Sequence, residues 1–441
     1  MNMFNKFLKA VSALWVAAAF CSFGLSAQET SSRWMFGKFV PADEQTWGSA
    51  HYMKATTHGE GVMKAEDASG NDLPTYRIVK GRAAAGPFKA GDSFSFEVPA
   101  ANLQAGSFVS FDATLSAEPG APKQWVVEWL DGDRWVTGRK YICHGPALNK
   151  NHRYTTIHQV FRLQCAPASD LLKVRLRALE GETIPAMEGV GSSGLVMFAT
   201  QTYIGVNIQD FGMAEPKDTT RVLCVGNSFT YYNSCPMMLK EIAWNEGHYI
   251  DMSASVKGGW SMGQHLDFAP TDDLVAEGGY DVVFLQDQSQ APAKVGYDKK
   301  KNASLLKAMT GMADKVRTTS RDCRVVVECT WAYPGKQNGG FESVSQFYKY
   351  AGKGARMMAK AAKAEVSPIR EAFRIANIER PDILMFAPDG YHQSPYGSYL
   401  KSCVNYLLIY GEKFGDSPSD CGLNAKKAAA LRSIAEQVVL Q

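Results

Sequence analysis

Three residues of the chain, Ser228, Asp389 and His392, are of the types that carry out nucleophilic catalysis. A serine hydroxyl is a poor nucleophile at neutral pH and needs a base within hydrogen-bond reach, which histidine provides. A carboxylate on the other ring nitrogen of that histidine fixes its tautomer. Because Asp389 and His392 are three residues apart in a predicted loop, one turn of the chain can bring the carboxylate onto the imidazole. These residue types therefore predict a serine nucleophile with its base.

Ser228 follows a predicted buried strand. Val222–Val225 is an uninterrupted apolar run, which is typical of a parallel sheet with both faces covered. Gly226-Asn227-Ser228 ends the strand, and the residues up to Gly247 predict a helix. Open α/β sheets place their chemistry at the carboxyl ends of such strands. The tripeptide alone is also typical of a turn with a capping serine, and the downstream Asp389 and His392 favour the catalytic interpretation.

The chain from Thr219 onward alternates predicted strands with predicted helices. We expect strands at 249–256, 281–286 and 324–329, a short apolar stretch at 383–386, and helices near 305–316, 342–362, 395–410 and 425–439. Alternation of this kind predicts a three-layer α/β sandwich, with a mostly parallel sheet covered by helices on both faces.

The chain between about Trp34 and Ile208 has a different pattern. Short, partly alternating segments are separated by clusters of Gly, Pro, Asn and Asp, which predicts an all-β sandwich of jelly-roll type. The polar, proline-bearing stretch Ala214–Asp218 joins the two patterns. We therefore expect a β-sandwich domain at residues 31–215 and an α/β domain at residues 219–441.

The first 27 residues are typical of a secretory signal peptide. Lys6 and Lys9 precede an apolar run, and small residues lead to a cleavage site near Ala27. No other stretch approaches the roughly 20 apolar residues of a membrane helix, so we expect a soluble secreted or periplasmic protein without membrane insertion after cleavage. Removing residues 1–27 takes away two lysines and no acid, so the net charge falls from +3 to +1. A nearly neutral protein gives no electrostatic reason to expect nucleic acid as a partner.

Cysteine and histidine spacings match no standard metal site. No CxxC pair occurs, and the histidines near Cys143 have no zinc-ligand spacing. We therefore expect neither a metal nor an organic cofactor, and the spacing leaves disulfide pairing open. The tryptophans of the first half are expected in the core, although aromatic rings of this kind also stack on sugars. The histidines concerned are His144, His152 and His158, and the tryptophans are Trp34, Trp47, Trp125, Trp129 and Trp135.

Residues 219–441 resemble the SGNH hydrolases, also called the GDSL esterase/lipase superfamily. Gly226-Asn227-Ser228 is similar to the nucleophile block of that superfamily, with Asn227 where Asp is more usual. Asp389-Gly390-Tyr391-His392 is similar to its last block. The resemblance implies Ser228 as nucleophile, His392 as general base and acid, and Asp389 as orienting carboxylate. It also implies a flavodoxin-like sheet, and the whole chain resembles exported SGNH esterases of Bacteroidetes with an N-terminal β-sandwich.

The same resemblance implies an oxyanion hole. Its donors are the backbone N–H groups of Ser228 and of Gly259, with Gly258 as the near alternative. The third block of the superfamily usually reads Gly-x-Asn-Asp, whereas this chain has Gln286-Asp287-Gln288-Ser289. Gln288 carries the same amide donor on a longer side chain, and Gln286 is the other residue that can reach inward.

The expected activity is that of an exported serine esterase without a cofactor. Its substrate is an acylated carbohydrate or other small ester, from which an acetyl or similar group is removed through an acyl-enzyme intermediate. A lipid esterase or thioesterase of the same fold and a non-catalytic glycan-binding envelope protein are the alternatives. Residues that can contact the substrate are Asn227, Trp260, Gln286 and Trp331, and the two tryptophans are equally compatible with packing.

Overall fold

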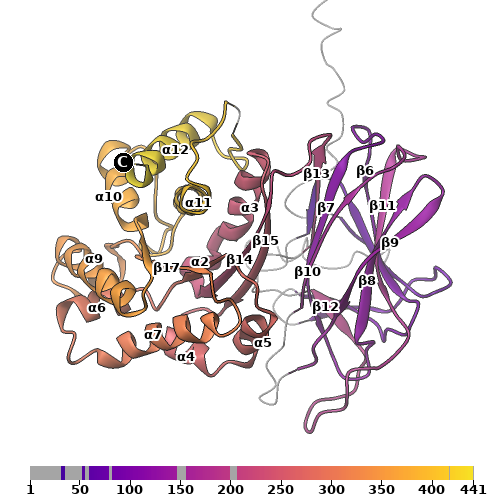
Figure 1. Cartoon of the computed structure of the whole chain (residues 1–441), viewed down its shortest axis with the longest axis horizontal. Coiled ribbons are helices and arrows are strands. Elements are labelled where there is room, and N and C mark those ends of the chain that lie inside the picture. Colours follow the sequence, from indigo (N-terminus) through magenta and orange to yellow (C-terminus); the bar gives the residue numbers. More distant parts are fainter. Residues whose placement is uncertain are drawn as a thin grey trace, which may run out of the picture.

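The computed structural model describes residues 31–34, 52–54, 59–78, 82–146, 155–198, 206–416 and 418–440. The predicted signal peptide with its cleavage site near Ala27, Trp47 and His152 lie outside these residues. Antiparallel strands form one side of the molecule, and a parallel sheet with helices forms the other (Figure 1). Within the described ranges, no helix has the length and apolar character needed to cross a membrane.

The first half of the chain folds as two antiparallel sheets over one core. One sheet has the order β1-β13-β7-β12-β5-β4, with β10 paired to β7, and the other has the order β2-β3-β6-β11-β8-β9. The strands are β1 (Ser32–Trp34), β2 (Tyr52–Lys54), β3 (Val62–Glu66), β4 (Thr75–Ile78), β5 (Arg82–Ala85), β6 (Ser93–Pro99), β7 (Phe108–Ala117), β8 (Gln124–Asp131), β9 (Arg134–Ile142), β10 (Thr155–Arg162), β11 (Leu171–Ala178), β12 (Val196–Phe198) and β13 (Val206–Gly212).

The core between these sheets is aromatic. Trp34, Trp125 and Trp129 are buried there, which confirms the core prediction for these three, whereas Trp135 on β9 is exposed. The predicted jelly-roll connectivity and the division of the chain at 215 and 219 stay predictions.

The second half contains a five-stranded parallel sheet of order β15-β14-β16-β17-β18. In chain order this is 2-1-3-4-5, so the strand order reverses beside β14, and doubly wound sheets bind ligands at such a switch point. The predicted parallel sheet is confirmed. The strands are β14 (Thr219–Gly226), β15 (Tyr249–Val256), β16 (Val282–Leu285), β17 (Arg324–Glu328) and β18 (Glu365–Ser367).

Helices cover both faces of the parallel sheet (Figure 1). Successive residues of β14 explain why its apolar run is unbroken: Val222 and Cys224 pack in one core cluster with α3, α11 and α12, and Leu223 and Val225 pack in another with α5, α6 and α7. The helices are α2 (Ser228–Tyr231), the 3₁₀ turn η1 (Tyr232–Ser234), α3 (Cys235–Asn245), α4 (Met262–Leu266), α5 (Ala269–Glu277), α6 (Ala291–Tyr297), α7 (Ala303–Arg317), α8 (Gly335–Gly340), α9 (Val344–Ala361), α10 (Ile369–Glu379), α11 (Pro395–Tyr410) and α12 (Ala425–Val439).

The apolar stretch at 383–386 is not a strand of the parallel sheet. Ile383 and Met385 are buried, so the apolar pattern reports their burial correctly. The backbone there pairs with the loop after His392 through a single bridge, Phe386 with Gln393. This pairing fixes the loop that carries His392 instead of extending the sheet.

A buried charged cluster joins the antiparallel sheet to the α/β half. His158 of β10 lies between two carboxylates, with Nδ1 3.0 Å from Asp112 Oδ1 and Nε2 2.6 Å from Asp251 Oδ1. Lys240 of α3 donates to Asp112 at 2.8 Å, and the Tyr249 hydroxyl donates to Asp112 at 2.7 Å. Because each ring nitrogen of His158 faces a carboxylate, the protonated imidazolium fits this place best.

The stability of this junction is expected to fall with rising pH. Burial alone would lower the pKa of His158, but Asp251 and Asp112 outweigh burial and raise that pKa. A histidine whose pKa is raised on folding stabilises the folded state fully at pH values below its unfolded pKa of about 6.5. This stabilisation is lost as the pH rises through the pKa of the folded state. Arg221 also faces this cluster, because its side chain pairs with Asp251 at 3.3 Å.

We therefore expect His158→Gln to lower the midpoint of thermal unfolding more at pH 6 than at pH 9. His144→Gln, on the half-buried loop after β9, is the matched control and is expected to show no such difference. Thermal melts at the two pH values measure both variants. An equal loss for His158→Gln at pH 6 and pH 9 would show that the imidazole is neutral in the folded protein.

Candidate active site

The structure brings Ser228, His392 and Asp389 together at the carboxyl edge of the parallel sheet. His392 Nε2 lies 2.8 Å from Ser228 Oγ, and His392 Nδ1 lies 2.7 Å from Asp389 Oδ2. Both separations are hydrogen-bond distances. Ser228 is half-buried, His392 is buried, and Asp389 is exposed at the rim. The arrangement is that of a serine with a histidine base and an orienting carboxylate.

The loop around Asp389 fixes the carboxylate under the imidazole. Asp389 Oδ1 accepts hydrogen bonds from the N–H groups of Tyr391 and His392, each at 3.0 Å. Gly390, between Asp389 and Tyr391, has a φ of +71°, which favours glycine. Burial alone would raise the pKa of Asp389, but the hydrogen bonds from His392 and from these two amides outweigh it and lower the pKa. The carboxylate therefore stays ionised at neutral pH.

Three aromatic rings hold the imidazole of His392. The Tyr232 ring is parallel to it at a centroid distance of 4.3 Å, and the Tyr391 ring lies 4.0 Å away at a tilt of 38°. The Phe229 ring meets its edge at 5.5 Å. Contacts of this kind restrict the ring to the orientation in which its two nitrogens point at Ser228 and Asp389.

Asn227 and Gln286 are structural, and their prediction as substrate contacts is wrong. Asn227 is 2% exposed and Gln286 is 1% exposed. The Asn227 side chain accepts from Phe229 N at 3.1 Å and donates to Trp260 O at 2.8 Å. Gln286 Oε1 accepts from Asn227 N at 2.9 Å and from Thr230 Oγ1 at 3.0 Å. Both amides are used to hold the turn that carries Ser228, and neither reaches the surface.

Trp331 is also wrongly predicted as a substrate contact. It is 1% exposed and stacks between Phe229 at 4.6 Å and Phe373 at 4.2 Å. Its indole N–H donates to Tyr391 O at 3.0 Å, which leaves no polar group for a ligand. Trp260, in contrast, is half-buried, and the Lys257 ammonium lies 4.2 Å from its ring centroid.

The predicted oxyanion donors lie just after the carboxyl ends of β14, β15 and β16. Ser228 is the first residue of α2, where a backbone N–H has no partner within its own helix. Gly259 is exposed with a φ of +77°, and a Cβ there would meet no other atom, whereas a Cβ on Gly258 would come 2.9 Å from the Tyr231 hydroxyl. Gln288 Oε1 accepts from Gln290 N at 2.9 Å, which fixes the orientation of the Gln288 amide. Their role in holding an oxyanion stays a prediction.

Asp287 is a site residue that the sequence analysis did not single out. Its Oδ1 accepts from Met262 N at 2.8 Å and from Gln288 N at 2.7 Å. It thereby ties the loop after β15 to the loop after β16, and these loops carry Gly259 and Gln288. Burial raises the pKa of Asp287 to about 6, although the two backbone hydrogen bonds lower it. The only sequence signal was its position in the divergent third block.

A left-handed turn lies against the Asp389 loop. Three non-glycine residues of α8, Lys336, Gln337 and Asn338, have φ values of 48°, 53° and 57°, a conformation that L-residues rarely adopt in succession. Gly335 N donates to Gly390 O at 3.0 Å, which attaches the turn to the loop. The Lys336 ammonium lies 3.9 Å from the Tyr391 ring centroid. The turn thus places a cation at the rim of the site.

A pocket of about 370 Å³ opens beside Tyr232. It shares Tyr232 with the surroundings of His392, and most of its other lining is apolar. The remaining lining residues are Asn233, Leu384, Phe386, Ala387, Pro388, Ser394, Pro395 and Tyr396. In the part of the chain that the structure describes, no group of three or more His, Cys, Asp or Glu side chains is arranged to hold a metal ion.

No protein-family model matches the chain, and no curated protein matches it. A solved DUF4886 family protein from Bacteroides uniformis is similar over 51% of this chain and 95% of its own, at 18% identity and a TM-score of 0.43. A lipase from a goat rumen metagenome is similar over 45% of this chain and 99% of its own, at 15% identity and a TM-score of 0.33. The acetylxylan esterase Axe2 from Geobacillus stearothermophilus, as a catalytic mutant, is similar over 45% of this chain and 97% of its own, at 12% identity and a TM-score of 0.33. All three similarities cover about half of this chain.

Proposed function

We propose that the chain is an exported serine esterase of the SGNH type that removes acetyl or other small acyl groups from carbohydrates. The observation that carries the proposal is the continuous hydrogen-bonded series from Ser228 through His392 to Asp389, at 2.8 Å and 2.7 Å. Acyl transfer needs a nucleophilic hydroxyl, a base that is hydrogen-bonded to it, and a carboxylate that orients the base. Here the hydroxyl lies at the N-terminus of a helix. No cofactor enters the proposed reaction.

In the proposed reaction, Ser228 Oγ attacks the acyl carbon while His392 Nε2 takes its proton. The negative charge on the carbonyl oxygen is held by the N–H groups of Ser228 and Gly259 and by the Gln288 amide. His392 then gives the proton to the leaving alcohol, and the acyl group stays on Ser228. A water molecule deprotonated by His392 attacks the acyl-enzyme, releases the acid and restores the serine hydroxyl.

The substrate class rests on two supports. The first is the resemblance of the Ser228 and His392 blocks to SGNH esterases. The second is Trp260, a half-buried indole close in sequence to Gly259, because aromatic faces pack well against sugar rings. Acetate release from a panel of acetylated polysaccharides tests the proposal. We expect release by the wild type and none by Ser228→Ala, and no release from any member of the panel would contradict the substrate class.

The apolar pocket lined by Leu384, Phe386 and Pro395 favours a second candidate, an esterase or thioesterase for longer acyl chains. Initial rates on 4-nitrophenyl esters of increasing chain length separate the two candidates. We expect the highest rate with acetate, and a maximum at octanoate or longer would favour the second. Tight glycan binding without ester cleavage would instead favour a non-catalytic glycan-binding protein.

Gln288→Ala is expected to lower kcat by about 10²- to 10³-fold with little change in KM, because one donor to the developing oxyanion is lost. Steady-state kinetics on 4-nitrophenyl acetate measure the effect. Gln346→Ala is the matched control and is expected to keep wild-type rates, because Gln346 is a half-buried glutamine of α9 whose side chain contacts Glu342. Wild-type kcat in Gln288→Ala would exclude this side chain as an oxyanion donor.

A further inference from the structure

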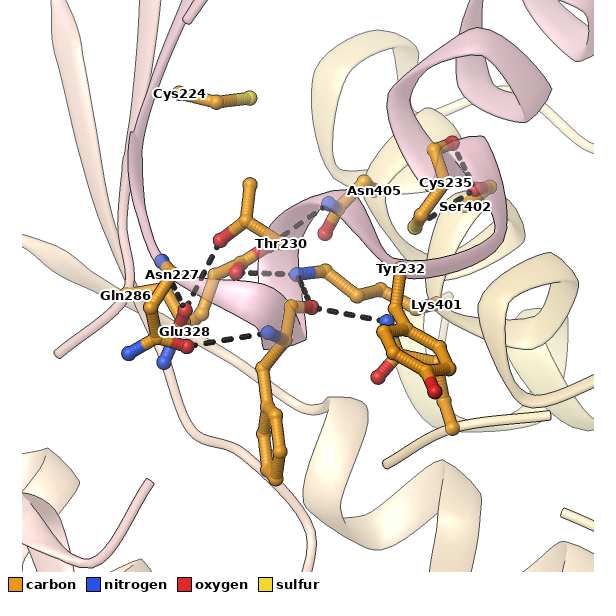
Figure 2. Close-up of polar contacts among 12 residues, drawn as sticks. Cys224, Asn227, Thr230, Tyr232, Cys235, Gln286, Glu328, Lys401, Ser402 and Asn405 are labelled. Carbon is orange, nitrogen blue, oxygen red and sulfur yellow. Dashed lines mark hydrogen bonds and ion pairs between the residues drawn. The ribbon is translucent and has the colours of Figure 1, made fainter. Parts of the chain in front are cut away.

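A buried ion pair lies against α2, the one-turn helix that begins with Ser228. Figure 2 shows this pair, Lys401 with Glu328. Lys401 of α11 and Glu328 at the end of β17 have side chains that are 3% and 2% exposed, and Lys401 Nζ lies 2.6 Å from Glu328 Oε2. Asn405, one turn further along α11, donates to Glu328 Oε1 at 3.0 Å. Neither charged residue takes part in the proposed reaction.

The ammonium of this pair reaches the main chain next to the nucleophile. Lys401 Nζ donates to the carbonyl oxygen of Phe229 at 2.9 Å, and Gln393 Nε2 donates to the same oxygen at 3.2 Å. Phe229 directly follows Ser228 in α2, and Gln393 directly follows His392. One carbonyl oxygen of the nucleophile's segment therefore accepts hydrogen bonds both from the segment of the base and from the buried pair.

The backbone explains why this carbonyl takes side-chain donors. In a continuing helix, the Phe229 carbonyl would accept from the N–H four residues later. Here the helix ends after one turn, because Tyr232 has a ψ of 139° and Asn233 has the left-handed values φ 54° and ψ 31°. The carbonyl is left at a helix end, where a partner must come from elsewhere. Lys401 and Gln393 supply it.

Stability alone does not account for a buried pair of charges. Taking both ions out of water offsets their attraction, and replacing such a pair with apolar side chains is often neutral or stabilising. Burial alone would lower the pKa of Lys401, but Glu328 outweighs burial and raises it, so the ammonium stays charged. A charged donor makes a stronger hydrogen bond than a neutral one. What the pair adds is a fixed donor at the Phe229 carbonyl.

We propose that Lys401, held by Glu328, is a positioning residue that sets the Ser228 turn against His392. The inference rests on the proposed esterase function. Lys401 holds the turn through its hydrogen bond to the Phe229 carbonyl, and Gln393 connects the same carbonyl to the loop that carries His392. The 2.8 Å contact between Ser228 and His392 therefore depends on both hydrogen bonds. Loss of the Lys401 donor lets the hydroxyl move relative to the imidazole, and small misplacements of reacting groups slow catalysis strongly.

The test compares Lys401→Met and the double variant Glu328→Gln/Lys401→Met with the wild type. We expect kcat on 4-nitrophenyl acetate to fall by about 10- to 100-fold with KM within about twofold, since the hydroxyl moves but the substrate contacts remain. The rate at which a fluorophosphonate probe labels Ser228 is expected to fall in parallel. The double variant is included because joint removal of a buried pair is tolerated better than removal of one partner.

Lys240→Met is the matched control for a purely structural effect. Lys240 is also buried, and it donates both to a carboxylate, Asp112, at 2.8 Å and to a backbone carbonyl, Ile250 O, at 2.7 Å. It serves the junction with the antiparallel sheet instead of the Ser228 turn. We expect Lys240→Met to lower the thermal midpoint and to keep the wild-type kcat and labelling rate.

Glu328→Gln alone removes the charge of the carboxylate but keeps the Lys401 donor and an amide oxygen that accepts from it. We expect Glu328→Gln to lower kcat by less than the variants without Lys401. If those variants do not fold, the kcat of Glu328→Gln tests whether the ion pair affects catalysis. Wild-type kcat in the folded variants, with an active wild type, would overturn this inference and leave the esterase proposal standing. A wild type without ester hydrolysis or probe labelling would overturn both.

Discussion

Replacing Ser228 with alanine is expected to lower kcat on 4-nitrophenyl acetate by about 10⁴- to 10⁶-fold, because the atom that forms the acyl-enzyme is removed. The fold is expected to be unchanged, since the Asn227 side chain, not the Ser228 hydroxyl, accepts the hydrogen bond that caps α2. Steady-state kinetics and circular dichroism measure the two effects. Any activity of Ser228→Ala above the uncatalysed rate then measures the rate enhancement that the oxyanion donors and substrate binding provide without the nucleophile.

Ser343→Ala is the matched control for Ser228→Ala. Ser343 is exposed and caps α9 by accepting from Gln346 N at 3.1 Å. Its loss is expected to cost about 1 kcal/mol of folding free energy, as for other capping serines, without a change in kcat. Hydrolysis at the wild-type rate by Ser228→Ala would place the nucleophile on another residue.

Asp389→Asn is expected to lower kcat by about 10³- to 10⁴-fold, because an amide does not hold the tautomer of His392 that accepts a proton from Ser228. The substitution keeps the size of the side chain and an oxygen for the N–H groups of Tyr391 and His392, so the loop is expected to stay folded. Kinetics between pH 6 and pH 9 measure the loss. Because the pKa of Asp389 is lowered, its carboxylate is ionised over this whole range in the wild type.

Asp131→Asn is the control for this substitution. Asp131 also braces a loop with its carboxylate, which accepts from Gln164 N and Cys165 N at 2.8 Å each, but it lies in the antiparallel half. We expect a small loss of stability and wild-type kinetics. If Asp389→Asn kept more than a tenth of wild-type kcat, the carboxylate would serve the loop and not the reaction.

Local sequence patterns predicted the elements that position the site. The predicted helix 395–410 coincides with α11 because its ends are marked in the chain: Ser394 caps it by accepting from Gly397 N at 3.1 Å, and Gly411, with a φ of +70°, ends it. The run Val222–Val225 predicted a strand covered on both faces for the same reason, since burial and apolar character coincide there.

The proximity of Ser228 and His392 was predicted from their residue types, from the place of Ser228 at a strand end and from the resemblance of two short blocks. No local pattern relates residues 164 positions apart.

Contacts that depend on tertiary packing were not predictable. A tryptophan that follows a strand can line a binding site or pack in the core. The structure shows that Trp331 packs in the core, because its ring stacks between Phe229 and Phe373. Asp287 and Lys401 act through backbone atoms of distant segments, and no pattern in their own segments indicates those partners. The left-handed turn at Lys336 is stabilised by its attachment to Gly390, which likewise lies far away in sequence.

The most direct test of the account is to identify the residue that a fluorophosphonate probe modifies in the wild-type protein. Intact mass followed by peptide mapping gives the number and the position of the adducts. We expect one adduct per chain, on Ser228, formed at a rate that falls when His392 is replaced by alanine. Ester hydrolysis by a protein whose Ser228 stays unmodified, or an adduct on another residue, would contradict the account.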